Sequence, residues 1–432
     1  MLMKETKKTK KTTKQKEAPR EHKKSWQELT ATVDEIKEFL DNRVFLRNNV
    51  ITRRTEVHVL SQFADETDKG PYWTNISDRI LNTLWTELAI TKPCTRVEHI
   101  QRVIESSYVP DFNPFTAYLD SLPKWKGDVD YIMELSLTVN VKGDADEQIL
   151  FYQYLKKWMI AMLAGWQFDH VVNHTILVLL GPQGCGKSSW LSLLLPPQLQ
   201  EYVYTKANAA KMSRDDMLIL AQKGLVIIEE MDALTPREQA VLKAITTMNN
   251  IDERAAYARY HEHRPHVASM AGTGNVKFLN DPTGSRRWIP FFVENIDNPR
   301  KHPFNYTGIY SQAYALLKQG FQYWFSQEEI ERLTAHNVDY EVECPERELV
   351  DIYFRKPHAG ESGEFMPVSR AMQTVSGGIS QKLSMTSMSH AFRELGFEYR
   401  RTKTSRGYIV VQRSALEIKE RQTYLAGDTD DG

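Results

Sequence analysis

The segment GPQGCGKS, residues 181–188, has the spacing of a loop that binds the phosphates of a nucleotide. Its glycines allow backbone N–H groups to curl around a phosphate, Lys187 can reach the β- and γ-oxygens, and Ser188 can bind Mg²⁺ where a helix begins. The apolar run TILVLL precedes the loop and a helical pattern follows it, which is the context that this motif requires. The residues that we expect at the nucleotide and its Mg²⁺ are Gly181, Gly184, Gly186, Lys187, Ser188 and Ser189.

Acidic residues follow a second apolar run, in VIIEEMD. The carboxyl end of a buried strand is where an α/β sheet places its ligand. Glu229 would orient the Mg²⁺ ion or one of its waters, and Glu230 would polarise the attacking water. Asp232 is a possible substitute, and a charged strand end facing solvent is the alternative interpretation.

Two further groups follow the third apolar run, which ends in GTGN. Asn275 could hold the attacking water or contact the terminal phosphate, or it could form an ordinary turn. Arg286 and Arg287 come next, in a loop broken by Pro282 and Gly284. An arginine there could project into a neighbouring subunit's site and stabilise charge on the transferring phosphoryl group, unless the pair is simply solvated. We favour Arg286 as this arginine finger, with Arg287 as its alternate or support.

The strands that must position these residues alternate with helical segments, which is typical of a parallel α/β sheet covered on both faces. Upstream, a helical pattern begins at SWQELTATVDEIKEFLDNR, where Ser25 can cap it. The segment VFLRNNVITRRTEVHVL reads as a hairpin with Asn48 and Asn49 in its turn. From about residue 74 to 165 the pattern is mainly helical.

The chain is therefore expected to have several domains. We predict a disordered basic tail at 1–24, a mainly helical N-terminal domain at 25–145, a phosphate-loop core at 146–300, a helical lid or linker at 301–343, and a winged-helix-like domain at 344–432 that ends in a short disordered tail. The winged-helix expectation rests on helices followed by a basic hairpin. Its basic residues, which could contact DNA phosphates or a protein, are Arg400, Arg401, Lys403 and Arg406.

The composition is that of a folded protein, with 432 residues, 41% of them hydrophobic, and a net charge of −1. Residues 1–24 carry ten Lys and Arg against three Glu, so this tail is either solubilising or a nonspecific phosphate-binding arm. No apolar run is long enough to span a bilayer, and the three cysteines are too far apart for a disulfide framework. We expect a cytoplasmic protein without membrane contact.

Together these motifs resemble the virulence-associated E family of P-loop ATPases, which lies close to the superfamily 3 helicases within the AAA+ class. The resemblance extends over about residues 43–340 and includes FLRNNVITRRTEV, VPDFNPFTAYLDSLPKWKGDVDYI and FLNDPTGSRRWIPF. It implies an AAA+-type core with ATP and Mg²⁺ as cofactors. The roles that it implies are ATP and Mg²⁺ binding by Lys187 and Ser188, an acidic pair at Glu229 and Glu230, a polar sensor at Asn275 and a finger at Arg286. Relatives commonly have Asp at the position of Glu229, so a water-mediated contact to the metal would serve as well as a direct one.

The resemblance also implies partners. Related helicases form rings, usually hexamers, and move single-stranded DNA with a hairpin that precedes the sensor strand. The matching segment is residues 253–266, where Arg254, Arg259, His261 and His263 alternate with tyrosines, as suits a surface that stacks bases and follows a backbone. A solvated connection, with Arg254 or Arg259 serving the nucleotide site, is the alternative.

We expect an ATP-hydrolysing motor that acts on single-stranded or forked DNA, such as a ring-forming helicase or replication ATPase of a phage or mobile element. The alternative is a nucleotide-switched oligomeric scaffold in regulation or defence that unwinds nothing. The sequence shows no origin-nicking or primase motif in residues 1–145, which weakens any expectation that the chain initiates replication alone.

Overall fold

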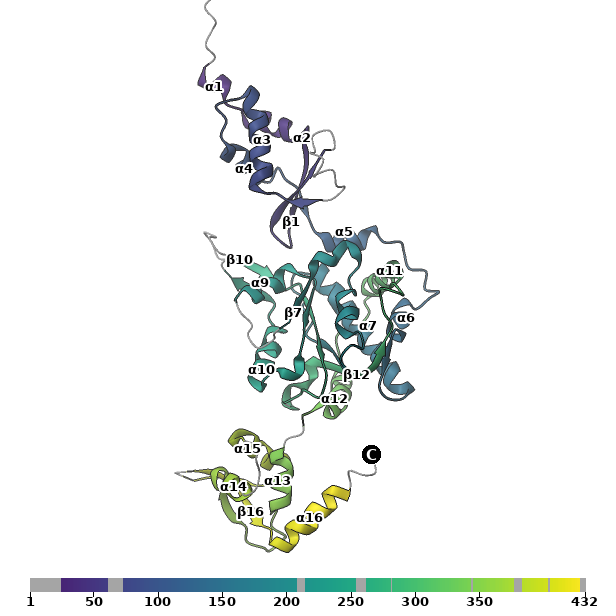
Figure 1. The fold of residues 1–432 in the computed structure, drawn as a ribbon, viewed down its shortest axis with the longest axis vertical. Coiled ribbons are helices and arrows are strands. Elements are labelled where there is room, and N and C mark those ends of the chain that lie inside the picture. Colours follow the sequence, from purple (N-terminus) through teal and green to yellow (C-terminus); the bar gives the residue numbers. More distant parts are fainter. Residues whose placement is uncertain are drawn as a thin grey trace, which may run out of the picture. The chain divides into compact units, whose positions relative to one another are not determined.

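The computed structural model describes residues 25–60, 73–207, 214–253, 262–280, 282–342, 345–376, 383–402 and 405–427. The chain divides into two compact units (Figure 1). The first comprises Met1–Val276 and Gly284–Ala335, and the second Lys277–Thr283 and His336–Gly432. Within the described ranges no helix has the length and apolar character needed to cross a membrane.

The N-terminal part of the first unit begins with two helices where the sequence suggested a single helical pattern. Ser25 caps α1 (Trp26–Leu29) as predicted, but Thr32 then caps α2 (Val33–Asp41). The Thr32 hydroxyl accepts from the backbone of Glu35, whose carboxylate accepts in return from the Thr32 backbone. This capping box starts a new helix and explains the break.

The predicted hairpin is present, but its turn lies further along the chain. Strands β1 (Val44–Asn49) and β2 (Arg54–Val59) pair antiparallel, so Asn48 and Asn49 belong to β1 and residues 50–53 form the turn. Asn49 is fully buried, and its amide donates to the Tyr202 hydroxyl at 2.7 Å. A buried amide that finds such a partner favours the strand over the turn.

Short strands and helices complete this part of the chain. They are β3 (Thr74–Asn75), α3 (Asp78–Thr91), α4 (Val97–Ile104), β4 (Asp111–Phe112), α5 (Pro114–Ser121), α6 (Tyr131–Leu137) and β5 (Val139–Val141). The predominance of helix between residues 74 and 165 agrees with the sequence pattern. Strand β5 was not predicted, because three residues are too few to show an alternating pattern.

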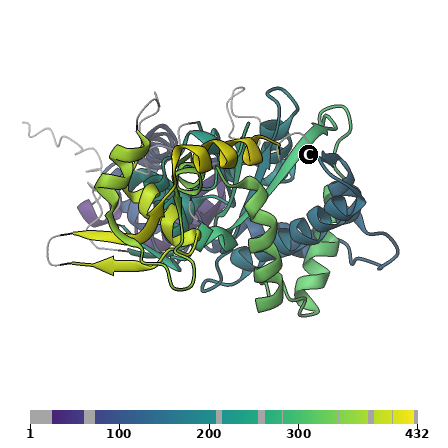
Figure 2. The same ribbon diagram turned by 90° about the horizontal axis from the view of Figure 1, so that it is seen from below.

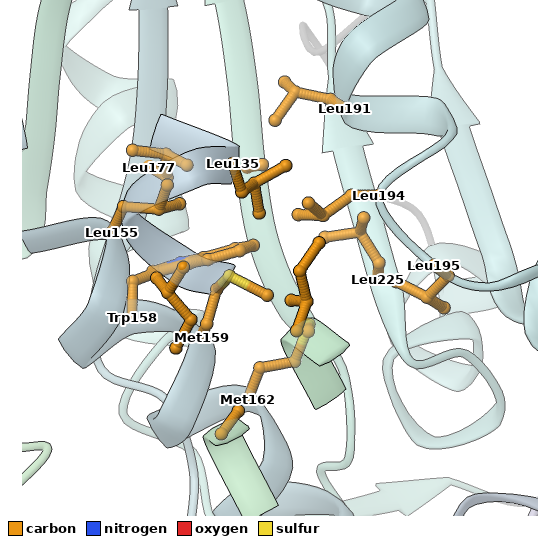
Figure 3. Close-up of a cluster of buried hydrophobic side chains, with 14 of the residues drawn as sticks. Leu135, Leu155, Trp158, Met159, Met162, Leu177, Leu191, Leu194, Leu195 and Leu225 are labelled. Atoms are coloured by element: carbon orange, nitrogen blue, oxygen red, sulfur yellow. The ribbon is translucent and has the colours of Figure 1, made fainter. Parts of the chain in front are cut away.

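The long helix α7 (Ala145–Gln167) is buried over its second half and packs against the central sheet. Figure 3 shows Leu155 and Trp158 of α7 beside Leu177 of the sheet. The Trp158 indole also donates to the backbone oxygen of Met270 at 3.3 Å. Helices α6, α7 and α11 (Tyr306–Lys318) pack on one another beside the sheet (Figure 1). A helix that is apolar on most sides, as α7 is here, belongs in a core.

The central sheet has six strands in the order β5-β12-β6-β11-β8-β7. The strands not yet given are β6 (Ile176–Leu180), β7 (Val203–Lys206), β8 (Leu225–Ile228), β11 (Ser269–Gly274) and β12 (Trp288–Ile296). All neighbours pair parallel except β5, which pairs antiparallel with β12 at the edge. The mixed α/β fold with a parallel sheet is therefore confirmed, with an antiparallel edge strand that was not foreseen.

Helices and a small hairpin connect these strands. They are α8 (Lys187–Ser192), η1 (Pro197–Tyr202), α9 (Arg214–Gln222), η2 (Met231–Ala233), α10 (Pro236–Ile245), β9 (Asn250–Glu253), β10 (Glu262–Pro265) and η3 (Pro282–Arg287). Helix α12 (Gln327–His336) follows the last strand of the sheet. Strands β9 and β10 form their own antiparallel sheet just before β11.

The second unit has its own core around Phe392 and Tyr408, whose rings stack with centroids 4.9 Å apart. Its elements are η4 (Asn337–Tyr340), α13 (Pro345–Tyr353), β13 (Phe354–Arg355), β14 (Glu364–Pro367), α14 (Val368–Val375), α15 (Met385–Glu394), β15 (Tyr399–Arg401), β16 (Arg406–Gln412) and α16 (Ala415–Gly427). Both β14 and β15 pair antiparallel with β16, and the β15–β16 hairpin extends away from the helices of this unit (Figure 2).

Candidate functional site

The phosphate loop lies between β6 and α8, at the carboxyl end of the parallel strands. Gly181 has a φ of +148°, and a Cβ there would overlap the backbone oxygen of Val293 on β12. Gly186 has a φ of +100° and caps α8 in the left-handed region. Larger residues fit neither position without strain. The backbone is thus shaped as the motif requires, by a close approach to β12 and by a left-handed turn.

Lys187 is buried inside this loop, with 7% of its surface exposed. Its ammonium group donates to the backbone oxygens of Gly181 at 2.7 Å and Pro182 at 2.8 Å. The next two residues of α8, Ser188 and Ser189, are exposed. The loop thus holds a buried cation and an exposed hydroxyl, which are the groups that a nucleotide phosphate and its metal need.

A buried tryptophan on α8 fixes how this helix is oriented on the core. Trp190 is fully buried, and its indole donates to the Thr138 hydroxyl at 2.8 Å. Since Trp190 follows Lys187 by less than one helical turn, this anchor sets the direction in which the first turn of α8 faces.

The acidic segment begins where β8 leaves the core. Ile228 is fully buried, Glu229 is half-buried and Glu230 is exposed. The backbone N–H of Glu229 donates to the oxygen of Lys206 at 3.0 Å, which extends the pairing of β8 with β7 by one residue. The Lys206 ammonium in turn forms a 2.8 Å ion pair with Asp216 of α9. Glu229 is therefore held at the same edge of the sheet as the phosphate loop.

Asn275 comes directly after β11, which lies between β6 and β8. Gly274, the last residue of β11, pairs with Leu180, and its oxygen accepts from the Gly181 N–H at 3.2 Å. The exposed Asn275 therefore stands between the phosphate loop on one side and the acidic segment on the other. The structure thus brings together Lys187, Ser188, Glu229 and Asn275 at one edge of the sheet.

Arg286 and Arg287 lie at the opposite end of the parallel strands, where β12 begins. Strands β12 and β6 are parallel, with Trp288 beside Ile176 and Phe292 beside Leu180. Arg286 and Arg287 come just before β12 begins, whereas the phosphate loop follows the end of β6. The stretch from Ile176 to Leu180 spans about 13 Å at the usual rise of a strand. The body of the sheet thus separates both arginines from the phosphate loop of the same chain.

The two arginines line a cavity of about 210 Å³. Among the described residues neither guanidinium has an ion pair or a hydrogen bond. Burial lowers the pKa of His174, and the charges of Arg287 and Arg286 lower it further. Burial and the charge of Arg286 also lower the pKa of Arg287. The other lining residues include Thr175, Tyr323, Trp324 and Phe325. This cavity therefore gathers positive charge without a neutralising partner in the described part of the chain.

The basic hairpin before the sensor strand is confirmed as a hairpin by the pairing of β9 with β10. Arg254, Arg259 and His261 lie outside the described residues, and His263 is exposed on β10. His266, which follows β10, is buried, and its Nδ1 lies 3.0 Å from the Met248 oxygen. Burial lowers the pKa of His266 to about 4, so it stays neutral and supports the base of the hairpin.

The basic residues of the second unit lie on the β15–β16 hairpin. Arg401 pairs with Arg406 across the strands, and Arg400 pairs with Gly407. All three arginines are exposed, and Lys403 lies outside the described residues. Like charges directly opposite each other destabilise a hairpin. An anion bound between them would remove that cost.

A third acid, Asp232, also lies close to this site. Asp232 was considered only as a substitute for the two glutamates, yet its carboxylate lies against Gly274 beside Asn275. The signal was present in VIIEEMD as the third acid. The position of Asp232 beside Gly274 depends on a backbone turn after β8 that cannot be predicted from the residue types.

Comparisons with known proteins agree with these motifs. The sequence profile of the virulence-associated protein E-like domain matches residues 119–342. A search of curated proteins found no match. Among solved structures, the C-terminal region of NrS-1 in its apo form is similar over 88% of this chain and 98% of that chain, with 11% identity and a TM-score of 0.46. A point mutant of RuvB from Thermotoga maritima is similar over 62% and 94%, with 14% identity and a TM-score of 0.24. Structural likenesses this distant carry no argument about function.

Proposed function

Because the chain belongs to the virulence-associated protein E-like family, we propose that it is an ATPase that binds ATP at residues 181–188 and works on DNA as an assembly of several copies. The single observation that carries this proposal is the meeting of Lys187, Ser188, Glu229 and Asn275 at one edge of the sheet. Separate strands contribute these residues, and only the parallel arrangement brings them together.

The residues present fit ATP and Mg²⁺ as their chemistry requires. The shaped loop from Gly181 to Gly186 offers backbone N–H groups to phosphate oxygens, and Lys187 adds a positive charge. The Ser188 hydroxyl and the Glu229 carboxylate are oxygen donors, which Mg²⁺ prefers, and Glu229 can act through a water. When bound, Mg²⁺ neutralises charge on the β- and γ-phosphates.

Hydrolysis needs further groups that the chain supplies. The Lys187 ammonium group would break its hydrogen bonds to the backbone oxygens of Gly181 and Pro182. It would then donate to the terminal phosphate, which is the stronger acceptor. Asn275 would orient the attacking water without adding negative charge. The arginine finger would come from a second copy, because the sheet separates Arg286 from the phosphate loop of its own chain. Arg287 would support it from the same loop.

A shared site of this kind requires an assembly in which the end of the sheet that carries Arg286 in one copy faces the phosphate loop of the next copy. Such a head-to-tail interface generates a ring if the rotation closes. We propose an AAA+-type ring, such as a hexamer, with the β9–β10 hairpin and the winged-helix-like second unit contacting DNA. The order helix α13, strand β14, helices α14 and α15, hairpin β15–β16 supports the winged-helix assignment.

The DNA motor is tested by measuring ATP hydrolysis with and without single-stranded DNA, and then strand displacement on a forked duplex. We expect DNA to stimulate hydrolysis several-fold and the assembled protein to separate the strands. Lys187→Ala is the matched control and should abolish both signals, because it removes the cation of the phosphate loop. An assembled ATPase that neither responds to DNA nor separates strands would refute the motor and favour a nucleotide-switched scaffold.

A further inference from the structure

The chain makes an unusual turn directly after β8. Glu230 has φ and ψ of +57° and +47°, the left-handed region, which is unfavourable for residues other than glycine. The next residue, Met231, is fully buried, and a Cβ on Gly272 would lie only 2.7 Å from its Cγ. The turn therefore directs η2 back over β11 instead of letting the chain continue along β8.

This turn places the third acid against the sensor strand. Asp232 Oδ1 lies 3.0 Å from the position that a Cβ on Gly274 would occupy. Gly274 is hydrogen-bonded to Gly181 of the phosphate loop and is followed by Asn275. Asp232 therefore lies close to both the phosphate loop and Asn275, the predicted polar sensor.

One oxygen of the Asp232 carboxylate lacks a hydrogen-bond donor among the described residues. This oxygen, Oδ1, is buried. Burying an acceptor without a donor destabilises the fold, and more so when the acceptor is charged. A water hydrogen-bonded to Oδ1 at this place would remove that cost. Glu230 differs, because its side chain is exposed and solvated.

We propose that Asp232, and not Glu230, is the carboxylate that activates the attacking water. This inference rests on the ATP hydrolysis proposed above. The water oxygen attacks the terminal phosphorus, and the bond from that phosphorus to the bridging oxygen breaks with its electron pair leaving on ADP. The proton of the water passes to the Asp232 carboxylate and then to solvent. Asn275 orients the same water through its amide.

The test compares Asp232→Asn with Glu230→Asn in the full-length protein. Both changes remove one carboxylate, and Asn tolerates the left-handed conformation at position 230 better than most residues. We expect Asp232→Asn to lower kcat by ~100-fold or more, the usual effect of losing a general base. Glu230→Asn should lower kcat much less than Asp232→Asn does, because the Glu230 side chain is exposed whereas Asp232 Oδ1 is buried against Gly274.

A binding measurement separates this role from a structural one. The anisotropy of a fluorescent ATP analogue in Mg²⁺ should show that Asp232→Asn binds as tightly as the wild type or more tightly, since a negative charge beside the phosphates is removed. Weaker binding that no longer depends on Mg²⁺ would overturn the assignment and make Asp232 a metal ligand. Weaker binding with an unchanged Mg²⁺ dependence would overturn it as damage to the loop.

The remaining outcomes are also decisive. Full kcat in Asp232→Asn, or a ~100-fold loss in Glu230→Asn whether or not Asp232→Asn is also impaired, would overturn the assignment to Asp232 and leave ATP hydrolysis standing. Absence of hydrolysis by the wild-type assembly would instead overturn the proposed function, and this inference with it.

Discussion

At the scale of single residues, the site depends on backbone conformations that only some side chains tolerate. Gly181 and Gly186 are required by φ values of +148° and +100°. Glu230 adopts the same kind of conformation without being glycine. Residues held in such conformations tend to lie at functional sites, where the strain is retained because the position matters.

The strain at Glu230 leads to a prediction about stability. Glu230→Gly should be more stable than Glu230→Ala by about 1 kcal/mol, because only glycine adopts a left-handed conformation without a Cβ penalty. Urea unfolding of the two variants measures this difference, and both lack the carboxylate, so its loss cancels. Equal stability of the two variants would mean that the turn is not strained.

The sequence predicted most residues of the site and little of its geometry. The phosphate loop and the acids after β8 follow spacing rules and were found from residue types alone. The sequence could not place Asp232 against Gly274, because the left-handed turn at Glu230 accompanies the packing of Met231 against Gly272. Nor could it show that a stretch of sheet lies between Arg286 and its own phosphate loop, because this depends on strand order.

At the scale of elements, the predicted parallel strands are confirmed. Strands β6 and β8 are uninterrupted apolar runs, such as Ile176–Leu180, whereas β11 also contains Ser and Thr. Positions set by tertiary contacts were wrong. Asn48 and Asn49 lie in β1 because Asn49 finds a buried partner in Tyr202. Local propensity alone cannot weigh such a contact. The break in the first helix has a local cause instead, because Thr32 and Glu35 form a second capping box.

The β15–β16 hairpin gives the prediction at this scale. If Arg401 and Arg406 face a DNA phosphate, Arg406→Ala should weaken binding to DNA and reduce the slope of log K against log salt concentration by about 0.9. Binding titrations at several salt concentrations measure this slope. Lys419→Ala, an exposed charge on α16, is the matched control and should leave it unchanged. An equal effect of both variants would show that only net charge matters.

At the scale of the whole molecule, the two ends of the parallel strands carry different groups. The carboxyl end, with the phosphate loop, holds Lys187, Glu229 and Asn275, and the amino end holds Arg286 and Arg287 in a positively charged cavity. Neither end by itself contains every group that phosphoryl transfer uses. We therefore predict that one copy is a poor ATPase and that activity depends on contact between copies.

Mixing two inactive variants tests this central claim most directly. Lys187→Ala keeps Arg286 and Arg286→Ala keeps the phosphate loop, so each variant should be inactive alone and an equimolar mixture should regain hydrolysis. If copies assemble at random, about a quarter of the interfaces combine an intact loop with an intact arginine, and the rate should approach that fraction of wild type. A mixture no more active than its components, or full activity of Arg286→Ala alone, would contradict the account.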